Sequence, residues 1–244
     1  LVHAPKGSRR ASGLSNPLVQ AHRIELAPHS PKEILVDVRP LSIDGAWEFT
    51  PRQFGDSRGV FLEWFKGTEV EEALGHPFSL QQANLSVSAA GVLRGIHFAD
   101  VPPGQAKLVT CVSGAVLDVI VDIRVGSDTF GQWDSVLLDD TDRRAVYLQE
   151  GLGHAFLSLQ DGSTVTYLCS EPYSPTGEHG IDPLDPELGI TWPTTDRAGQ
   201  PLELLLSDKD RVAPSLAAAR ESGLLPTVES TRAFVAGLGR DSPS

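Results

Sequence analysis

Residues 115–123 read Ala-Val-Leu-Asp-Val-Ile-Val-Asp-Ile, and this run decides the fold class. Apolar residues recur at every second position from Ala115 to Ile123, whereas Asp118 and Asp122 fall at alternate positions. A period of two is typical of a β-strand, because successive side chains point to opposite faces of a sheet. The run predicts a strand with one packed face, whose other face carries two carboxylates that serve as structural hydrogen-bonding groups.

Similar short runs recur along the chain, at residues 60–65, 80–87, 107–112, 135–138, 145–148 and 163–170. The turns Ser113-Gly114 and 139–142 separate neighbouring runs, as antiparallel hairpins require. Helical patterns are confined to 68–74 and to the tail, where Pro214 precedes one segment and 230–238 forms another. This pattern predicts an all-β sandwich or jelly roll with few helices.

Composition narrows the range of partners. The chain has 244 residues, 40% of them hydrophobic, with 20 Lys and Arg against 32 Asp and Glu, for a formal charge of −12. Such an acidic chain is not expected to bind nucleic acid or an anionic membrane through charge alone, and no apolar run approaches the roughly 18 residues that cross a bilayer. The two cysteines, Cys111 and Cys169, form no disulfide framework or metal-binding spacing, which indicates a reducing compartment. We therefore expect a cytoplasmic protein.

Residues 1–36 differ from the rest of the sequence. They hold five basic and two acidic residues, a net charge of +3, and are rich in Pro, Ser and His. This composition predicts a disordered extension ahead of one folded domain at 37–244. A targeting signal is the alternative interpretation.

The segment 92–98, Val-Leu-Arg-Gly-Ile-His-Phe, places Arg94 and His97 on either side of a glycine. Histidine titrates near neutral pH, and Lys107, His154 and Tyr167 add further residue types that proton transfer uses. For His97, a hydrogen-bonded role in the core is the structural alternative.

Several other chemistries are disfavoured by the motifs. Small β-barrels that bind metal commonly use a His-x-His pair, but Ala99 stands where the second histidine after His97 would be, so we expect a metal-free site. The sequence contains no Gly-x-Ser-x-Gly elbow, phosphate-binding Gly-x-x-x-x-Gly-Lys loop or Gly-x-Gly-x-x-Gly fingerprint. A nucleotide would have to be held by side chains, for which arginine is suited.

Nine motifs, in order, resemble the dTDP-4-dehydrorhamnose 3,5-epimerase family between about residues 38 and 238. They lie at 56–63 (Asp-Ser-Arg-Gly-Val-Phe-Leu-Glu), 82–86, 93–98, 105–107, 118–124, 151–156, 185–186, 192–193 and 206–210 (Leu-Ser-Asp-Lys-Asp). The resemblance implies an all-β, cupin-like double-stranded jelly roll with short peripheral helices and C-terminal helices from about residue 211. It also implies a homodimer that exchanges a strand and needs no cofactor.

The resemblance further implies a substrate and a reaction. The substrate would be a dTDP-4-keto-6-deoxyhexose, inverted at carbons 3 and 5 beside its carbonyl, as in rhamnose-type deoxysugar biosynthesis. By the same resemblance, His97 would be the base that removes the proton, and Asp210 would be its carboxylate partner. Tyr167 would be the acid on the opposite face, and Lys107 would be the cation that stabilises the enolate oxygen. Asp208 and Asp185 stay open as other partners of His97.

The same resemblance assigns residues that hold the nucleotide and sugar. These expected contacts are Arg58, Phe61, Glu63, Gln82, Asn84, Arg94, His154, Tyr173 and Glu178. Arg58 or Phe61 would serve the partner's pocket. A structural role stays open for His154, and Tyr173 could either stack on the thymine or sugar or cover the edge of the core.

The sequence leaves three alternative functions open. The nearest is a mono-epimerase that inverts carbon 3 alone in an antibiotic deoxysugar pathway. A second is a jelly roll that binds a sugar nucleotide without turnover, for which His97 would be dispensable. A third is a metal-dependent cupin oxygenase or isomerase.

Overall fold

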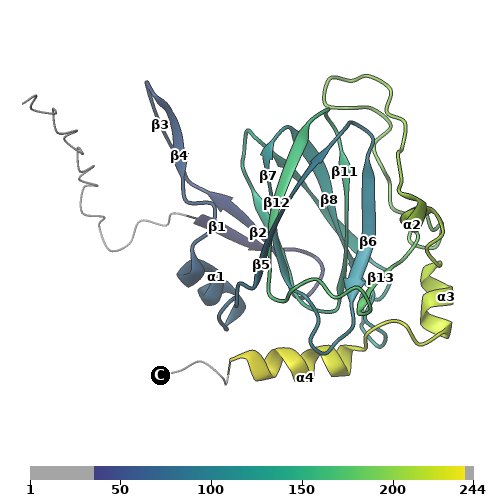
Figure 1. Cartoon of the computed structure of the whole chain (residues 1–244). Helices are drawn as coiled ribbons and strands as arrows, with labels where there is room; N and C mark the ends of the chain where they lie inside the picture. Colours follow the sequence, from purple (N-terminus) through teal and green to yellow (C-terminus); the bar gives the residue numbers. More distant parts are fainter. Residues whose placement is uncertain (1–35, 240–244) are drawn as a thin grey trace, which may run out of the picture. The chain divides into compact units, whose positions relative to one another are not determined.

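Two antiparallel sheets face each other in the computed structural model, which describes residues 36–239 (Figure 1). The six-stranded sheet has the order β1 (Val36–Pro40), β2 (Ala46–Pro51), β10 (Ala145–Leu148), β7 (Lys107–Ser113), β12 (Ser163–Cys169) and β5 (Gln82–Ser88). The five-stranded sheet has the order β13 (Glu178–Gly180), β6 (Leu93–Ala99), β11 (Leu152–Ser158), β8 (Ala115–Asp122) and β9 (Trp133–Asp139). The predicted jelly roll is confirmed. The leader predicted at residues 1–36 lies outside the described residues, apart from Val36.

Four short helices surround the sheets. They are α1 (Gly67–Leu74), α2 (Asp208–Arg211), α3 (Leu216–Glu221) and α4 (Val228–Leu238). The side chains of Ser215 and Thr227 cap α3 and α4 by accepting from backbone N–H groups, so α3 begins two residues after Pro214 and α4 begins two residues before the predicted position 230. No helix within residues 36–239 is long and apolar enough to cross a membrane.

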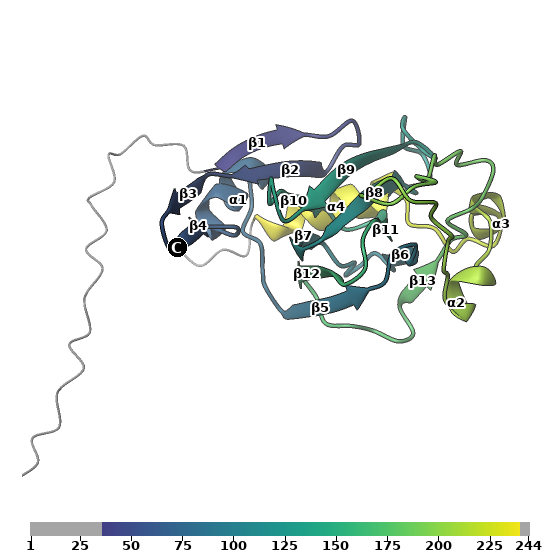
Figure 2. The same ribbon diagram turned by 90° about the horizontal axis from the view of Figure 1, so that it is seen from above.

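The β3–β4 hairpin stands apart from both sheets. Strands β3 (Gln53–Asp56) and β4 (Gly59–Leu62) pair only with each other, and nearly all of their residues are exposed. Seen from above, the hairpin and α1 lie at one end of the molecule, whereas α2 and α3 lie at the other (Figure 2). Within residues 36–239, no other segment therefore covers the hairpin.

Strand β8 corrects the expectation of a single packed face. Val116 and Ile120 pack in the core between the sheets, while Val119 and Val121 pack on the outer face beneath Leu216 of α3. Both faces are buried because C-terminal segments cover the five-stranded sheet. A period of two shows which residues share a face, but it does not show how many faces are covered.

Several strands escaped the sequence analysis, namely β1, β2, β3, β6, β11 and β13. All seven residues of β11 are buried, so this strand shows no alternation between polar and apolar residues. Strand β6 contains Gly95, which weakens a strand pattern. The run predicted at 60–65 is a strand only as far as Leu62.

A buried ion pair fixes the end of β8. Arg124 donates through Nε and Nη2 to the two carboxylate oxygens of Asp122, at 2.9 and 2.8 Å, and both side chains are almost fully buried. Burial acts to raise the pKa of Asp122, but hydrogen bonds from Arg124, Ser127 and Thr129 outweigh it, so the pKa is lowered. The structural role predicted for Asp122 agrees with these contacts.

Replacing Arg124 by Met should lower the free energy of unfolding by about 3–5 kcal/mol, because it leaves a buried carboxylate without its cation. Urea denaturation of the purified variant measures this loss. Adding Asp122→Asn to the same chain should recover part of it, because the uncompensated charge is removed. A double variant no more stable than Arg124→Met would show that charge burial is not the cause.

Candidate active site

Polar side chains line the inner face of the six-stranded sheet near one end. Lys107 lies on the same face of β7 as Val109 and Cys111, both of which belong to the core between the sheets. Tyr167 packs against that core from β12 and lies directly opposite Asn84 of β5. The strand register therefore points the side chains of Lys107, Tyr167 and Asn84 toward the space between the sheets.

A β-bulge shapes the facing wall. His154 of β11 pairs with His97 of β6, but Phe156 pairs with Arg94, so β6 holds one extra residue in this interval. Arg94 and His97 thus face the same side, although regular alternation would separate residues three apart. Gly95 has a φ of 116°, and a Cβ there would lie 2.6 Å from the Cα of Ala155, so this close approach requires glycine.

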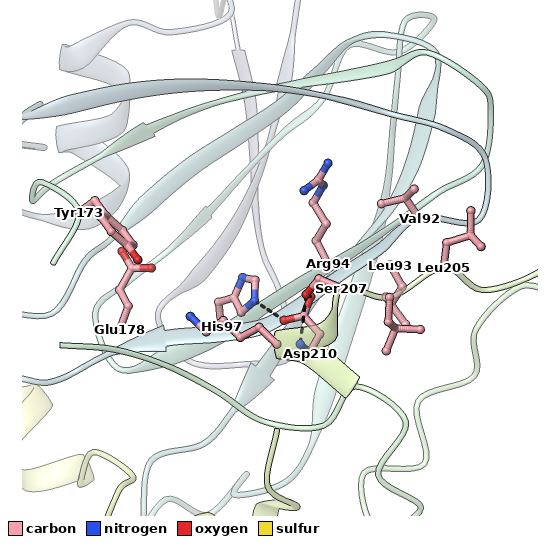
Figure 3. A pocket seen from close by; sticks show the side chains of 11 residues that line it. Val92, Leu93, Arg94, His97, Tyr173, Glu178, Leu205, Ser207 and Asp210 are labelled. Carbon is pink, nitrogen blue, oxygen red and sulfur yellow. Dashed lines mark hydrogen bonds and ion pairs between the residues drawn. The ribbon is translucent and has the colours of Figure 1, made fainter. Parts of the chain in front are cut away.

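His97 forms a short hydrogen bond with a carboxylate from a distant part of the chain. Its Nε2 lies 2.8 Å from Oδ1 of Asp210, the residue in α2 that the family resemblance suggested (Figure 3). Oδ2 of Asp210 accepts a second hydrogen bond from the Ser207 hydroxyl at 2.8 Å. Asp185, one of the alternatives, instead accepts from the backbone N–H groups of Glu187 and Leu216.

The charge state of Asp210 follows from these contacts. Burial acts to raise the pKa of this carboxyl, but the hydrogen bond and charge of His97, together with the Ser207 hydroxyl, outweigh burial and lower the pKa. The His97 side chain is 34% exposed and that of Asp210 only 6%. A carboxylate fixed behind a partly exposed imidazole is suited to orienting that ring.

The His97–Asp210 pair opens into a cavity of about 420 Å³, a size that admits a small molecule (Figure 3). The lining residues come from β6, β13, α2 and the segments around them: Val92, Leu93, Arg94, His97, Tyr173, Glu178, Leu205, Leu206, Ser207, Lys209 and Asp210. His97 lines this cavity together with four other residues predicted from the sequence. Three were expected to contact the substrate and one to act through His97: Arg94, Tyr173, Glu178 and Asp210.

Lys107 and Tyr167 lie beyond the lining of this cavity but share its electrostatic environment. Burial lowers the pKa of Lys107, and the charges of Cys169, Glu178 and Asp118 oppose that shift. Burial raises the pKa of Tyr167, opposed by the charge of Arg94 and a hydrogen bond from Asn84. Glu178 and Arg94 line the cavity, so charges at its lining act on both the amine and the phenol.

A second histidine–carboxylate pair lies deeper in the same wall. Nε2 of His154 is 2.8 Å from Oδ2 of Asp118, and both side chains are buried. Within residues 36–239, the other oxygen of Asp118 has no hydrogen-bond partner. These contacts agree with the structural hydrogen-bonding role expected for Asp118, and its partner His154 pairs across the strands with His97.

The structure does not bring the hairpin residues to His97. Arg58 and Phe61 line a separate hollow of about 230 Å³ on the hairpin itself, and Phe61 is 60% exposed. Glu63 is exposed just after β4. Within one chain, none of these three residues lines the cavity with His97.

Two further polar residues at the cavity were not singled out from the sequence. Lys209 and Ser207 both belong to the Leu-Ser-Asp-Lys-Asp motif and line the cavity beside Asp210. Ser207 caps α2 by accepting from the Asp210 N–H, a role that a serine three residues before an acidic residue could have indicated. Among residues 36–239, no three His, Cys, Asp or Glu side chains converge as metal ligands would.

Comparisons with known proteins place this fold and cavity in a family. Residues 40–218 match the family model described as dTDP-4-dehydrorhamnose 3,5-epimerase. The enzyme of that name from Mycolicibacterium smegmatis is 61% identical over 203 residues, which cover 83% of this chain and 97% of the relative. The chain belongs to the dTDP-4-dehydrorhamnose 3,5-epimerase family, whose members are isomerases acting on carbohydrates.

Two solved structures agree with this assignment. The rmlC epimerase of Mycobacterium tuberculosis is 54% identical, with a TM-score of 0.79 over 83% of this chain and 99% of that one. ChmJ, a 3'-monoepimerase from Streptomyces bikiniensis described as a double mutant in complex with dTDP, is 48% identical, with a TM-score of 0.78 and the same coverage. Its two substituted residues, a histidine and a tyrosine, lie 70 positions apart in its chain.

Replacing Asp210 by Asn should lower stability at neutral pH by roughly 1–2 kcal/mol, because hydrogen bonds to a charged acceptor are lost. The pKa of Asp210 is lower in the folded protein, so its contribution is complete above the unfolded value of 3.8 and is lost as the pH falls through the folded value. Denaturation of both proteins between pH 3 and pH 7 should show curves that converge only in acid. A constant difference across this range would contradict the assignment.

Proposed function

We propose that the protein inverts carbons 3 and 5 of dTDP-4-dehydro-6-deoxyglucose, with the carbonyl at carbon 4 activating both positions. The observation that carries this proposal is the His97–Asp210 pair at the cavity, with Tyr167 on the opposing sheet. One proton leaves the carbon and another returns, so no electrons are exchanged and the step balances without a redox partner.

His97 is the proposed base. Its Nε2 is held by Asp210, and Nδ1 makes no hydrogen bond within residues 36–239, so Nδ1 is the nitrogen available to accept a proton. The carboxylate stabilises the imidazolium that forms. An imidazole positioned in this way can act as the general base that removes the proton beside a ketone.

Tyr167 and Lys107 supply the proposed complementary roles. Inversion requires the second proton to arrive on the face opposite the base, and Tyr167 projects from the facing sheet. Because burial raises its pKa, the phenol holds its proton until the enolate forms. Lys107 steadies the enolate oxygen, the kind of fixed donor whose removal costs roughly 3–4 kcal/mol in the transition state.

The cavity also suits the other parts of the substrate. Arg94 and Lys209 are cations at its lining, where they would bind the diphosphate. Tyr173 offers a ring 54% exposed, on which a thymine or sugar would stack. Glu178 supports the proposal as an acceptor for sugar or ribose hydroxyls.

A carbon 3 mono-epimerase is the second candidate, because ChmJ is one and is 48% identical. The histidine and tyrosine substituted in ChmJ have the same separation as His97 and Tyr167 in this chain. Both kinds of enzyme would therefore share this residue pair, and the number of inverted carbons depends on how the pocket presents each face of the ring.

Turnover in deuterated water tests the proposed reaction. The wild-type protein, mixed with dTDP-4-dehydro-6-deoxyglucose, should incorporate solvent deuterium at carbons 3 and 5, as followed by NMR. His97→Asn should still bind the nucleotide sugar but lose at least about 100-fold in exchange, since a general base contributes 10²–10⁴. Label at carbon 3 alone would favour the mono-epimerase, and unchanged exchange in His97→Asn would contradict the proposed base.

We also propose that the enzyme is a homodimer in which the β3–β4 hairpin reaches the partner's cavity. Its exposed Arg58 and Phe61 have no role in the cavity of their own chain. Among the strands of residues 36–239, β5 lies at the edge of its sheet, and it exposes Leu85 and Val87 at 65% and 60% on its outer face. An unpaired edge beside apolar side chains is a surface that a second chain would cover.

Complementation between two inactive variants tests this exchange. Arg58→Ala and His97→Asn should each be impaired, whereas an equal mixture after subunit exchange should recover about a quarter of wild-type activity, because half of the dimers are mixed and each has one intact site. If Arg58 serves its own chain's cavity, the mixture would show no recovery.

A cytoplasmic location is proposed as well. Cys111 and Cys169 are both free and buried, the state expected of thiols in a reducing compartment.

A further inference from the structure

Strand β5 presents its side chains in an unusual order. Leu85 and Val87 face outward and are exposed, whereas Gln82, Asn84 and Ser86 face the space between the sheets. Strands at the surface of a sandwich usually show the reverse, with apolar side chains inside. The inward polar residues therefore need hydrogen-bond partners within the protein or in a ligand.

Gln82 and Asn84 already have such partners. The backbone N–H of Tyr173 donates to Oε1 of Gln82 at 2.9 Å, and Nε2 of Gln82 donates to Oδ1 of Asn84, also at 2.9 Å. Nδ2 of Asn84 donates to Sγ of Cys169 at 3.7 Å. Asn84 also lies directly opposite Tyr167 on the same face of the sheet, and its side chain acts to lower the pKa of that phenol. A continuous series of contacts thus joins the segment of Tyr173 to Tyr167.

The backbone holds this series in place. Asn84 lies directly opposite Tyr167, and Gln82 lies directly opposite Cys169, in the antiparallel pairing of β5 with β12. The Thr166 hydroxyl donates to the Asn84 carbonyl at 3.0 Å, which adds a side-chain link between the same two strands. Both polar groups of the Asn84 carboxamide are also engaged by protein atoms, because Oδ1 accepts from Gln82 and Nδ2 donates to Cys169.

We propose that Gln82 and Asn84 are positioning residues, which hold the Tyr167 phenol toward the face of the sugar opposite His97, instead of acting only as substrate contacts. This inference rests on the proposed epimerase function. It replaces the expectation that both amides are primarily ligand donors. Because Gln82 holds the backbone of Tyr173, occupation of the Tyr173 surface by the substrate would be transmitted to the proton donor.

The geometry explains why such support matters. A phenol on a tyrosine ring has its position set by two side-chain torsions, and a displacement of about 1 Å can cost 10²-fold in rate. The donor must meet the enolate on one face while the imidazole stands on the other. Loss of the support should impair proton return more than proton removal.

Asn84→Ala separates these two steps in deuterated water. We expect formation of the inverted sugar to fall about 10-fold, in proportion to one lost hydrogen bond. Deuterium exchange with retained configuration, which needs only His97, should change less than about threefold. The ratio of exchange to inversion should therefore rise several-fold, approaching that of Tyr167→Phe, in which the donor itself is absent.

Matched variants control for general effects. Ser86→Ala changes the next inward residue of β5, whose hydroxyl has no hydrogen-bond partner within the described residues, and should leave the ratio unchanged. Gln82→Ala should raise the ratio less than Asn84→Ala, because it acts on the phenol through Asn84. Asn84→Asp keeps the shape but places a carboxylate beside the phenol, so the basic limb of the pH profile of kcat should move to higher pH.

The outcomes separate this inference from the proposed function. If the wild-type protein neither exchanges nor inverts the keto sugar, the proposed function is wrong. If the wild type is active but Asn84→Ala raises KM and lowers exchange and inversion by the same factor, Asn84 is a substrate contact and the positioning role is wrong. Should Asn84→Ala not fold, an unmoved pH profile in Asn84→Asp would equally overturn the inference.

Discussion

The site depends on one constraint, which is that a charged side chain turned into the space between the sheets needs a partner of opposite charge or a hydrogen bond there. Burying an unpaired charge costs far more than a hydrophobic contact supplies. His97 meets Asp210, His154 meets Asp118, and the charges of Glu178 and Asp118 favour the charged form of Lys107. The cavity can therefore be reactive while the adjoining apolar core keeps the two sheets packed.

The bulge in β6 determines which polar side chains of that strand face the cavity. A regular strand would turn Arg94 and His97 to opposite faces, because their separation is odd. One extra residue, made possible by the close approach at Gly95, brings the cation and the imidazole to the same cavity. The proposed chemistry thus rests on an irregularity, as is common where bulges adjoin functional sites.

Composition and burial explain which strands the sequence patterns predicted and which they missed. Strand β10 was predicted at its observed bounds, and β7, β8 and β12 to within about one residue, since their composition is strongly apolar and their turns are clear. Strand β11 was missed because both of its faces are buried, which erases alternation. The hairpin β3–β4 pairs with neither sheet, and its place apart is not visible in local sequence.

By itself, the sequence determined the all-β class, the C-terminal helices and, through ordered motifs, the family and the residue types of the site, because turns, caps and alternation act over a few neighbouring residues. Only the tertiary structure decided which carboxylate meets His97, that Asp118 belongs with His154, and that Gln82 and Asn84 engage each other. These are contacts between residues brought together by strand register, by a bulge and by a helix more than 100 positions away. No local sequence pattern can show which residues so far apart in the chain come into contact.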